Sequence, residues 1–493
     1  MNMKVKMTAE FVETQPLLFA AVLLSRIIIS LAVAVSGASA QTSPTAADGL
    51  SPELRGQLQA VRDAALADDY AWRQLAHLTE NIGPRPAGSP QAQAAAEYVA
   101  AEMRKLGLEV RLEPAQVSHW VRGEERAELV EYSGQVPGTT QRIVLTAIGD
   151  SPATPPEGTA AEVVVVHSFD ELAALGHDKV AGKMVLFNVP YDERKALGGM
   201  AFEAYGEAVV YRSRGAEATA ALGAVACLIR SVGGADYRLP HTGAGTPAGI
   251  PAAALAAEDA DLIEHLAAQG RVRMHLTLTP ETLPAVTGYN VVADIKGSEH
   301  PEQIVVVSGH LDSWDVGRGA IDDGAGVVIA METAEVLQQL HLRPRRTLRV
   351  IAWMDEENGG GGSKGYAKDH AAEMANHVAA IESDAGAGHP LGFSLKMSTA
   401  AIAALRPLAD ILQPVGATIF RVAEHTPGSD IAPLGEAGVP GIGIIQDGRK
   451  YFDYHHTAAD TLDKVDPREL RENAAAMAVM GYALAEMPEP LPR

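Results

Sequence analysis

The strongest constraint on the fold is the alternation of strand-like and helix-like segments after residue 287. Residues 302–310 (EQIVVVSGH) form an apolar run of the kind found in strands that are buried on both faces. An apolar-striped helical segment follows at 325–340, and a second strand-like run at 346–357. Two strands joined by a helix favour parallel pairing. The sequence therefore predicts an α/β fold with a doubly wound, mostly parallel sheet, whose ligand sites lie at the carboxyl ends of the strands.

The length of 493 residues exceeds what one hydrophobic core usually supports, so we expect more than one domain. Between residues 117 and 284, short β-type runs lie among Gly and Pro residues, and acids do not group with histidines at ligand-like spacing. We interpret residues 117–284 as an inserted β-rich domain. The catalytic domain would then consist of residues 41–116 and 285–487, followed by a tail at 488–493. The alternative, that 117–284 extends one large sheet, stays open.

The first forty residues differ in character from the rest of the chain. Residues 17–35 are almost wholly apolar, and the small residues 38–40 (ASA) that follow are typical of a signal-peptidase site. We expect residues 1–40 to be a signal peptide. The mature protein would be exported, periplasmic or secreted, without stable membrane association. Two glutamates ahead of the apolar run are unusual in a signal peptide, and they leave an uncleaved membrane anchor as the alternative.

Charge and cysteine content exclude several classes of protein. The chain has 62 Asp and Glu against 40 Lys and Arg, a formal net charge of -22. Such an acidic surface repels phosphates, so no nucleic-acid partner is expected. Cys227 is the single cysteine, so no intrachain disulfide can form, and its apolar neighbours indicate a buried thiol.

Acids and imidazoles gather where the predicted strands end. His310 and Asp312 follow one strand, a Gly-bracketed pair of aspartates precedes the next helix, and three acids follow the second strand. Further along, Asp384 ends a third strand and a pair of histidines follows a fourth. Carboxylates and imidazoles without thiolates suit catalytic Zn²⁺. A two-metal site needs five such ligands, and of the adjacent Glu356 and Glu357 one can bind metal while the other acts as general base.

The same segments resemble a known family. GHLDSWDVGRGAIDDGAG, AWMDEENGGGGS, AAIESDAG and YHHTAADT occur in the order found in the co-catalytic zinc aminopeptidases, and they are most similar to the plasma glutamate carboxypeptidase (carboxypeptidase Q) branch. IGPRPAGS resembles the opening of that family, and residues 163–266 look like its inserted protease-associated domain. The resemblance implies a dinuclear zinc exopeptidase that hydrolyses short peptides or dipeptides with free termini. Whether the protein assembles as a homodimer stays open.

Carried over position by position, the resemblance implies two Zn²⁺ per chain. His310 and Asp384 would bind one ion. Glu357 and His456 would bind the other, and Asp322 would bridge both.

The resemblance also assigns supporting roles. Glu356 would be the general base, and Asp312 would fix the tautomer of the metal-binding His310. The family's cis peptide bond after the bridging acid would fall between Asp322 and Asp323. In the family's tail pattern the neighbour of the ligand histidine is His455, which becomes a weak candidate for substrate contact.

The sequence also offers residues for contact with the substrate. The candidates are Ser429 and Asp430 in the loop at 426–441, and Arg449 or Lys450 as partners for a substrate carboxylate. Four histidines of the insert are expected to lie away from the site, namely His167, His177, His241 and His265. Three alternatives stay open: a one-zinc cyclase-like acyl transferase, a metal-dependent N-acyl amino acid deacylase and a non-enzymatic receptor-like binding protein.

Overall fold

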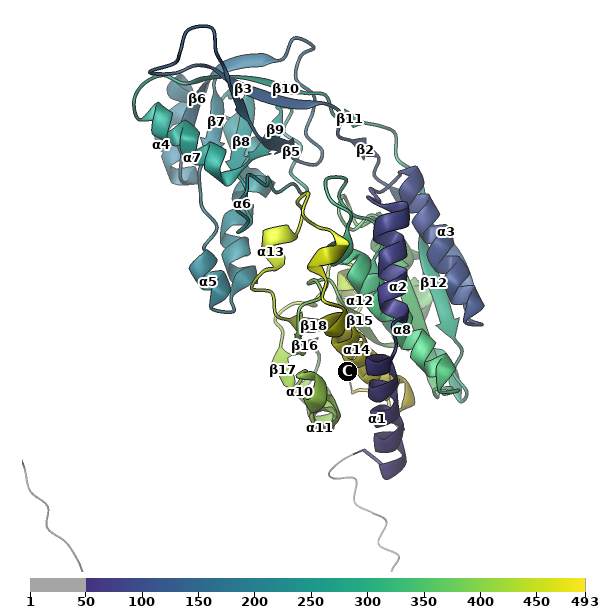
Figure 1. The fold of residues 1–493 in the computed structure, drawn as a ribbon. Helices are drawn as coiled ribbons and strands as arrows, with labels where there is room; N and C mark the ends of the chain where they lie inside the picture. The colour runs from purple at the N-terminus through teal and green to yellow at the C-terminus, as the bar shows by residue number, and fades with distance from the viewer. Residues whose placement is uncertain (1–49, 493) are drawn as a thin grey trace, which may run out of the picture. The chain divides into compact units, whose positions relative to one another are not determined.

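The computed structural model describes residues 50–492, which form two eight-stranded sheets and a two-stranded ribbon (Figure 1). The strands of the first sheet, in spatial order, are β1 (Glu109–Val117), β12 (Val286–Ile295), β14 (Arg346–Trp353), β13 (His300–His310), β15 (His377–Glu382), β18 (Gly441–Gln446), β16 (Pro390–Lys396) and β17 (Ile419–Val422). The four central strands, β14, β13, β15 and β18, are parallel, antiparallel pairs flank them on both sides, and β17 at one edge pairs in parallel with β16. The predicted α/β architecture is confirmed.

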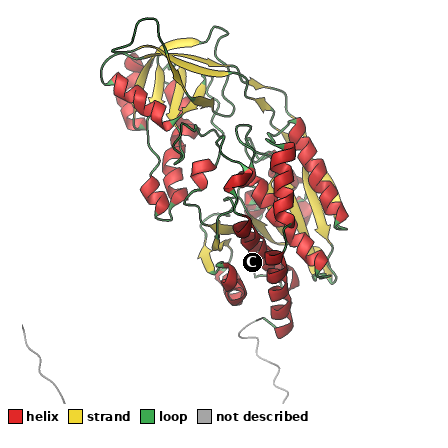
Figure 2. Ribbon diagram, in the orientation of Figure 1, coloured by secondary structure: helices red, strands yellow, loops and turns green. Residues whose placement is uncertain are grey.

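Both faces of this sheet are covered by helices, as Figure 2 shows. Along β13, Val305 and Val307 belong to the core formed with α1 (Pro52–Ala67), α8 (Ala325–Gln339) and α14 (Pro467–Glu486). Their neighbours Ile304 and Val306 belong to a separate core with α9 (Gly361–Asp369) and α12 (Ala432–Glu436). Because side chains alternate across a strand, an uninterrupted apolar run buries both faces.

Local sequence sets where the helices begin. In α3 (Pro90–Lys105) the Ser89 hydroxyl accepts a hydrogen bond from the Ala92 N–H at 3.1 Å, and Pro90 occupies the first helical position, where its missing N–H costs nothing. The remaining helices on or beside the first sheet are α2 (Tyr70–Ala76), α10 (Thr399–Leu405), α11 (Ala409–Leu412) and α13 (Tyr451–Tyr454).

The second sheet is formed by the part of the chain that lies between β1 and β12 in the sequence. Its strands, in spatial order, are β4 (Gln141–Ile143), β3 (Glu125–Glu131), β10 (Arg273–Leu278), β6 (Thr159–Val166), β7 (Met184–Phe187), β8 (Ala226–Arg230), β9 (Ala252–Leu255) and β5 (Leu145–Ala147). The helices α4 (Phe169–Val180), α5 (Glu193–Leu197), α6 (Ala201–Ala220) and α7 (Ala257–Ala267) accompany it. The chain passes between the two sheets through the ribbon of β2 (Trp120–Val121) and β11 (Glu281–Thr282).

None of the helices within residues 50–492 is both long and apolar enough to cross a membrane. The predicted signal peptide lies outside the described residues.

Candidate metal centre and active site

The first sheet brings the predicted ligands together at one edge. His310 is the last residue of β13, and Asp322 lies in the turn Ala320–Gly324 that leads into α8. Glu357 follows β14, Asp384 follows β15, and His456 follows α13 beyond β18. The carboxyl ends of the parallel strands meet here, which is where an open α/β sheet forms its ligand site.

One cluster of three side chains is centred on His310. Its Nε2 lies 3.1 Å from Asp322 Oδ1 and 3.5 Å from Asp384 Oδ1. His310 and Asp322 are buried, and Asp384 is partly exposed. One imidazole and two carboxylates within this range can hold a divalent cation and leave further positions open.

A second cluster shares Asp322 with the first. His456 Nε2 lies 3.0 Å from Asp322 Oδ2 and 3.0 Å from Glu357 Oε2, and all three side chains are buried. Asp322 therefore presents one oxygen to each cluster, as a bridging ligand would.

The carboxylate oxygens of this site that make no hydrogen bonds are suited to binding metal ions. Glu357 Oε1 is buried and has no hydrogen-bond partner, and the buried Asp322 Oδ2 makes no hydrogen bond although Nε2 of His455 and of His456 lie 3.2 and 3.0 Å from it. Such groups are costly to bury unless a proton or a cation compensates them. Burial raises the pKa of Glu357 to about 8 and the pKa of Asp384 to about 6 in the metal-free protein. The donor set is imidazole and carboxylate only, which suits Zn²⁺.

The imidazole orientations are fixed by backbone carbonyls. His310 Nδ1 lies 3.0 Å from the carbonyl oxygen of Asp312, and His456 Nδ1 lies 3.2 Å from that of Thr242. Each contact leaves Nε2 free to face the cluster.

The prediction that the Asp312 carboxylate fixes the tautomer of His310 is wrong. Its Oδ1 lies 3.9 Å from His310 Nδ1, too far for a hydrogen bond. The carboxylate instead accepts hydrogen bonds from the backbone N–H groups of Asp355, Glu356 and Glu357, at 2.8, 3.1 and 3.3 Å. Asp312 thus holds the loop that carries the predicted base and one predicted ligand.

The turn that carries Asp322 is also secured by acids. The peptide bond between Asp322 and Asp323 is cis, as the family resemblance implies. Asp323 accepts hydrogen bonds from the N–H groups of His310 and Gly326, at 3.0 and 2.9 Å. Asp460 is a functional residue that sequence reasoning missed: its Oδ1 accepts the N–H groups of Ala320 and Ile321, each at 2.8 Å.

Arg85, in the IGPRPAGS segment, also supports the site and was missed by sequence reasoning. It is fully buried, and its guanidinium donates hydrogen bonds to four backbone carbonyls. The acceptors are Leu311, Gly83, Arg318 and Gly319, at 2.7 to 3.1 Å. Arg85 therefore braces the segment between His310 and Asp322. The sequence signal that could have indicated this role is the position of Arg85 between two prolines, Pro84 and Pro86.

Glu356 faces a cavity of about 610 Å³ that opens onto both clusters. Its side chain is partly exposed, unlike that of the buried Glu357. Asp322, Glu357, Asp384 and His456 also line this cavity. The two adjacent glutamates therefore differ in environment, as a ligand and a base would.

The insert contributes to the same cavity, contrary to one expectation. His241 is fully buried, and its Nε2 lies 2.9 Å from Nδ1 of His455, whose Nε2 is 3.2 Å from Asp322 Oδ2. Tyr205 and Arg212 of α6 line the cavity wall. The prediction that His241 lies away from the site is wrong, because the fold packs the loop around residue 241 against the histidine pair. His167, His177 and His265 are not brought to it.

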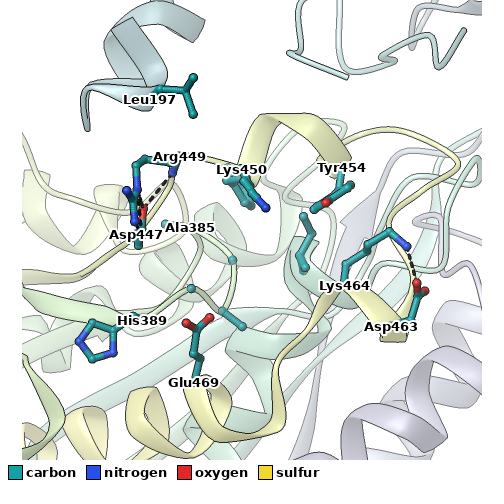
Figure 3. A pocket seen from close by; sticks show the side chains of 15 residues that line it. Leu197, Ala385, His389, Asp447, Arg449, Lys450, Tyr454, Asp463, Lys464 and Glu469 are labelled. Carbon is teal, nitrogen blue, oxygen red and sulfur yellow. Dashed lines mark hydrogen bonds and ion pairs between the residues drawn. The ribbon is translucent and has the colours of Figure 1, made fainter. Parts of the chain in front are cut away.

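The weak substrate candidates fall into different places. Ser429 and His455 line the metal-site cavity. Asp430 is buried, and both of its carboxylate oxygens lack hydrogen-bond partners, but it does not line the cavity. Arg449 and Lys450 line a neighbouring cavity of about 490 Å³, where Arg449 Nε lies 2.8 Å from Asp447 Oδ1 (Figure 3). Neither cation lines the metal-site cavity, although Arg449 shares a third cavity, of about 340 Å³, with Asp384.

Comparison with known proteins agrees with this site. The model of peptidase family M28 matches residues 290–480. Carboxypeptidase Q of Homo sapiens is 40% identical over 434 residues, which cover 87% of this chain and 88% of that protein. The chain belongs to peptidase family M28. It is therefore a hydrolase of the metalloprotease type, and its recognition from sequence as a zinc peptidase similar to carboxypeptidase Q is confirmed.

Solved structures support the same assignment. An M28 peptidase precursor from Shewanella amazonensis SB2B has a TM-score of 0.84 at 35% identity, covering 90% of this chain and 98% of that one. A zinc aminopeptidase from Bacillus subtilis has a TM-score of 0.62 at 21% identity, covering 85% and 95%, and shares the fold. These matches give no support to the deacylase or receptor-like alternatives.

Proposed function

We propose that this M28 peptidase is a dinuclear zinc exopeptidase that hydrolyses dipeptides and other short peptides with free termini. The observation that carries the proposal is the pair of ligand clusters joined through Asp322, with Glu356 on the wall of the cavity that they share. Carboxypeptidase Q and the aminopeptidases among its relatives are both named for removal of terminal residues.

The ligand set divides between two zinc ions. His310, Asp322 and Asp384 would hold one, and Asp322, Glu357 and His456 would hold the other. Bound there, the ions would polarise the scissile carbonyl and lower the pKa of the attacking water.

Glu356 is the proposed general base. Its carboxylate would take the proton from the attacking water and then deliver that proton to the departing amine, so the residue ends each turnover unprotonated. The backbone N–H of Glu356 is held by the Asp312 carboxylate at 3.1 Å, which limits the movement of the base. A cavity of about 610 Å³ has room for a dipeptide.

The wider organisation forms part of the same proposal. Residues 117–284 would be a protease-associated domain, and residues 1–40 an export signal that directs the protein to the periplasm or the exterior. Assembly as a homodimer stays a prediction.

The test is a substrate panel that separates the candidate activities. Dipeptides, tripeptides, N-blocked peptides and N-acyl amino acids are offered to the purified enzyme before chelation, after chelation and after zinc is restored. We expect cleavage of unblocked short peptides only, lost on chelation and recovered with zinc, at two zinc ions per chain. Cleavage that survives chelation, or a preference for N-acyl amino acids, would refute the proposal.

A further inference from the structure

The metal-site cavity is lined by four carboxylates, two imidazoles and, among the described residues, a single guanidinium. Its carboxylates are Asp322, Glu356, Glu357 and Asp384, and its only Lys or Arg among the described residues is Arg212. A dipeptide with free termini carries a carboxylate as well as an ammonium group. In a cavity of this charge pattern the substrate carboxylate needs a cation near it, and among the described residues that line this cavity Arg212 is the one Lys or Arg.

The guanidinium of Arg212 is fixed along one side and unpaired along the other. Its Nη1 donates to the Tyr205 hydroxyl at 2.7 Å and to the Thr242 carbonyl at 3.0 Å. Its Nε is buried without a hydrogen-bond partner, and Nη2 has no partner among residues 50–492. A buried N–H that lacks an acceptor is unfavourable, and an arginine with Nε and Nη2 unpaired matches the two oxygens of a carboxylate.

The guanidinium of Arg212 occupies space that is open because residue 243 is a glycine. A Cβ at Gly243, where φ is +134°, would lie 2.2 Å from Nη1 and 2.4 Å from the guanidinium carbon of Arg212. The site therefore depends on glycine at this position. Arg449, which shares another cavity with Asp384, is already engaged by the Asp447 carboxylate.

We infer that Arg212, contributed by the insert, binds the free α-carboxylate of the peptide substrate. This assignment rests on the proposed peptidase function. Arg212 lies beside His456, with Nη1 3.4 Å from Nδ1, so a carboxylate bound to it stands next to the second ligand cluster. The insert then selects short substrates with a free C-terminus. In a longer peptide the carboxylate lies too far from the scissile bond to reach Arg212, and a blocked terminus has no carboxylate.

The inference is tested by crossing an enzyme change with a substrate change. The values of kcat/KM are measured for alanyl-leucine and alanyl-leucinamide with the wild type, Arg212→Met, Arg212→Lys and the matched control Arg449→Met. Zinc content is measured for each protein. We expect the wild type to prefer the free acid by on the order of 10- to 100-fold, the range of a charge-assisted hydrogen bond. Arg212→Met should lose this preference, Arg212→Lys should retain part of it, and Arg449→Met should retain all of it.

Other outcomes would overturn the inference in distinguishable ways. Equal losses on both substrates, or loss of zinc from both Arg212 variants, would mean that Arg212 acts through His456 and not on the substrate. A wild type that cleaves acid and amide equally would remove the carboxylate site and leave the proposed peptidase intact. A wild type that cleaves neither would remove the proposed function itself.

Discussion

Replacing Glu332 with glutamine should make the protein more stable at neutral and alkaline pH. Glu332 lies in α8 and is 1% exposed. Its Oε2 accepts the N–H of Ala71 at 2.8 Å, and Oε1 is buried without a partner. Burial, with a smaller contribution from Asp68, raises the pKa of this carboxyl from 4.5 to about 8. The ionised form is therefore unfavourable in the folded protein.

The direction and size of the pH dependence follow from the linkage between proton binding and folding. Below pH 4.5 both states carry the proton, and the side chain does not make stability depend on pH. Above it the unfolded chain releases the proton while the folded chain keeps it, so the free energy of unfolding falls until pH passes about 8. At 1.36 kcal/mol per pH unit, the loss reaches about 3 kcal/mol at pH 7 and roughly 5 kcal/mol above pH 8.

Two opposing effects are smaller or independent of pH. The N-terminus of α2 favours a carboxylate at Ala71, but a helix dipole contributes only about 0.3–1 kcal/mol. A glutamine amide at the unpartnered Oε1 position costs about 1–3 kcal/mol, and this cost is the same at every pH. The difference between pH 5 and pH 9 is therefore the quantity to measure.

The assay is denaturant unfolding of the wild type and Glu332→Gln at several pH values between 5 and 9. The stability of the variant relative to the wild type should rise across this range by several kcal/mol. Glu97→Gln, on the exposed face of α3, is the matched control and should show no such trend. A pH-independent difference between wild type and Glu332→Gln would refute the reasoning.

Further predictions concern the site and its supports. Glu356→Gln should keep the zinc content of the wild type by elemental analysis and lower kcat by about 10²- to 10⁴-fold, the usual contribution of a general base, and a variant with near-normal kcat would contradict the assignment. Asp312→Asn should lower kcat by about 10-fold or more at nearly constant KM, because an amide oxygen accepts three backbone N–H groups less well than a carboxylate. Steady-state kinetics measure this, and equal changes in kcat and KM would count against a role in holding the base. Arg85→Lys should lower the free energy of unfolding by roughly 3 kcal/mol, since three ammonium protons cannot reach all four carbonyls, and an unchanged thermal midpoint would disprove the bracing role.

The sequence by itself determined the α/β fold and the residue types of the candidate metal site. A strand with apolar residues at every position must be covered on both faces, so the run ending at His310 indicated a central parallel strand. Acids and imidazoles after successive strands then had to meet at one edge of the sheet, which is why the order of residues along the chain is enough to group His310, Asp322 and Asp384. Local order was sufficient here because His310 and Asp384 lie at or just after the ends of strands and Asp322 lies directly before a helix.

Tertiary structure alone decided which residues support the ligands and which line the substrate cavity. The Asp312 carboxylate binds the loop after β14 and not the adjacent imidazole, because backbone N–H groups from a neighbouring strand lie within its reach. Arg212 and His241 reach the histidines near residue 456 only because the insert packs against that loop. Contacts between residues more than two hundred positions apart leave no periodicity or spacing in the sequence. For the same reason Arg449, close to the histidine loop in sequence, is paired with Asp447 beside a different cavity.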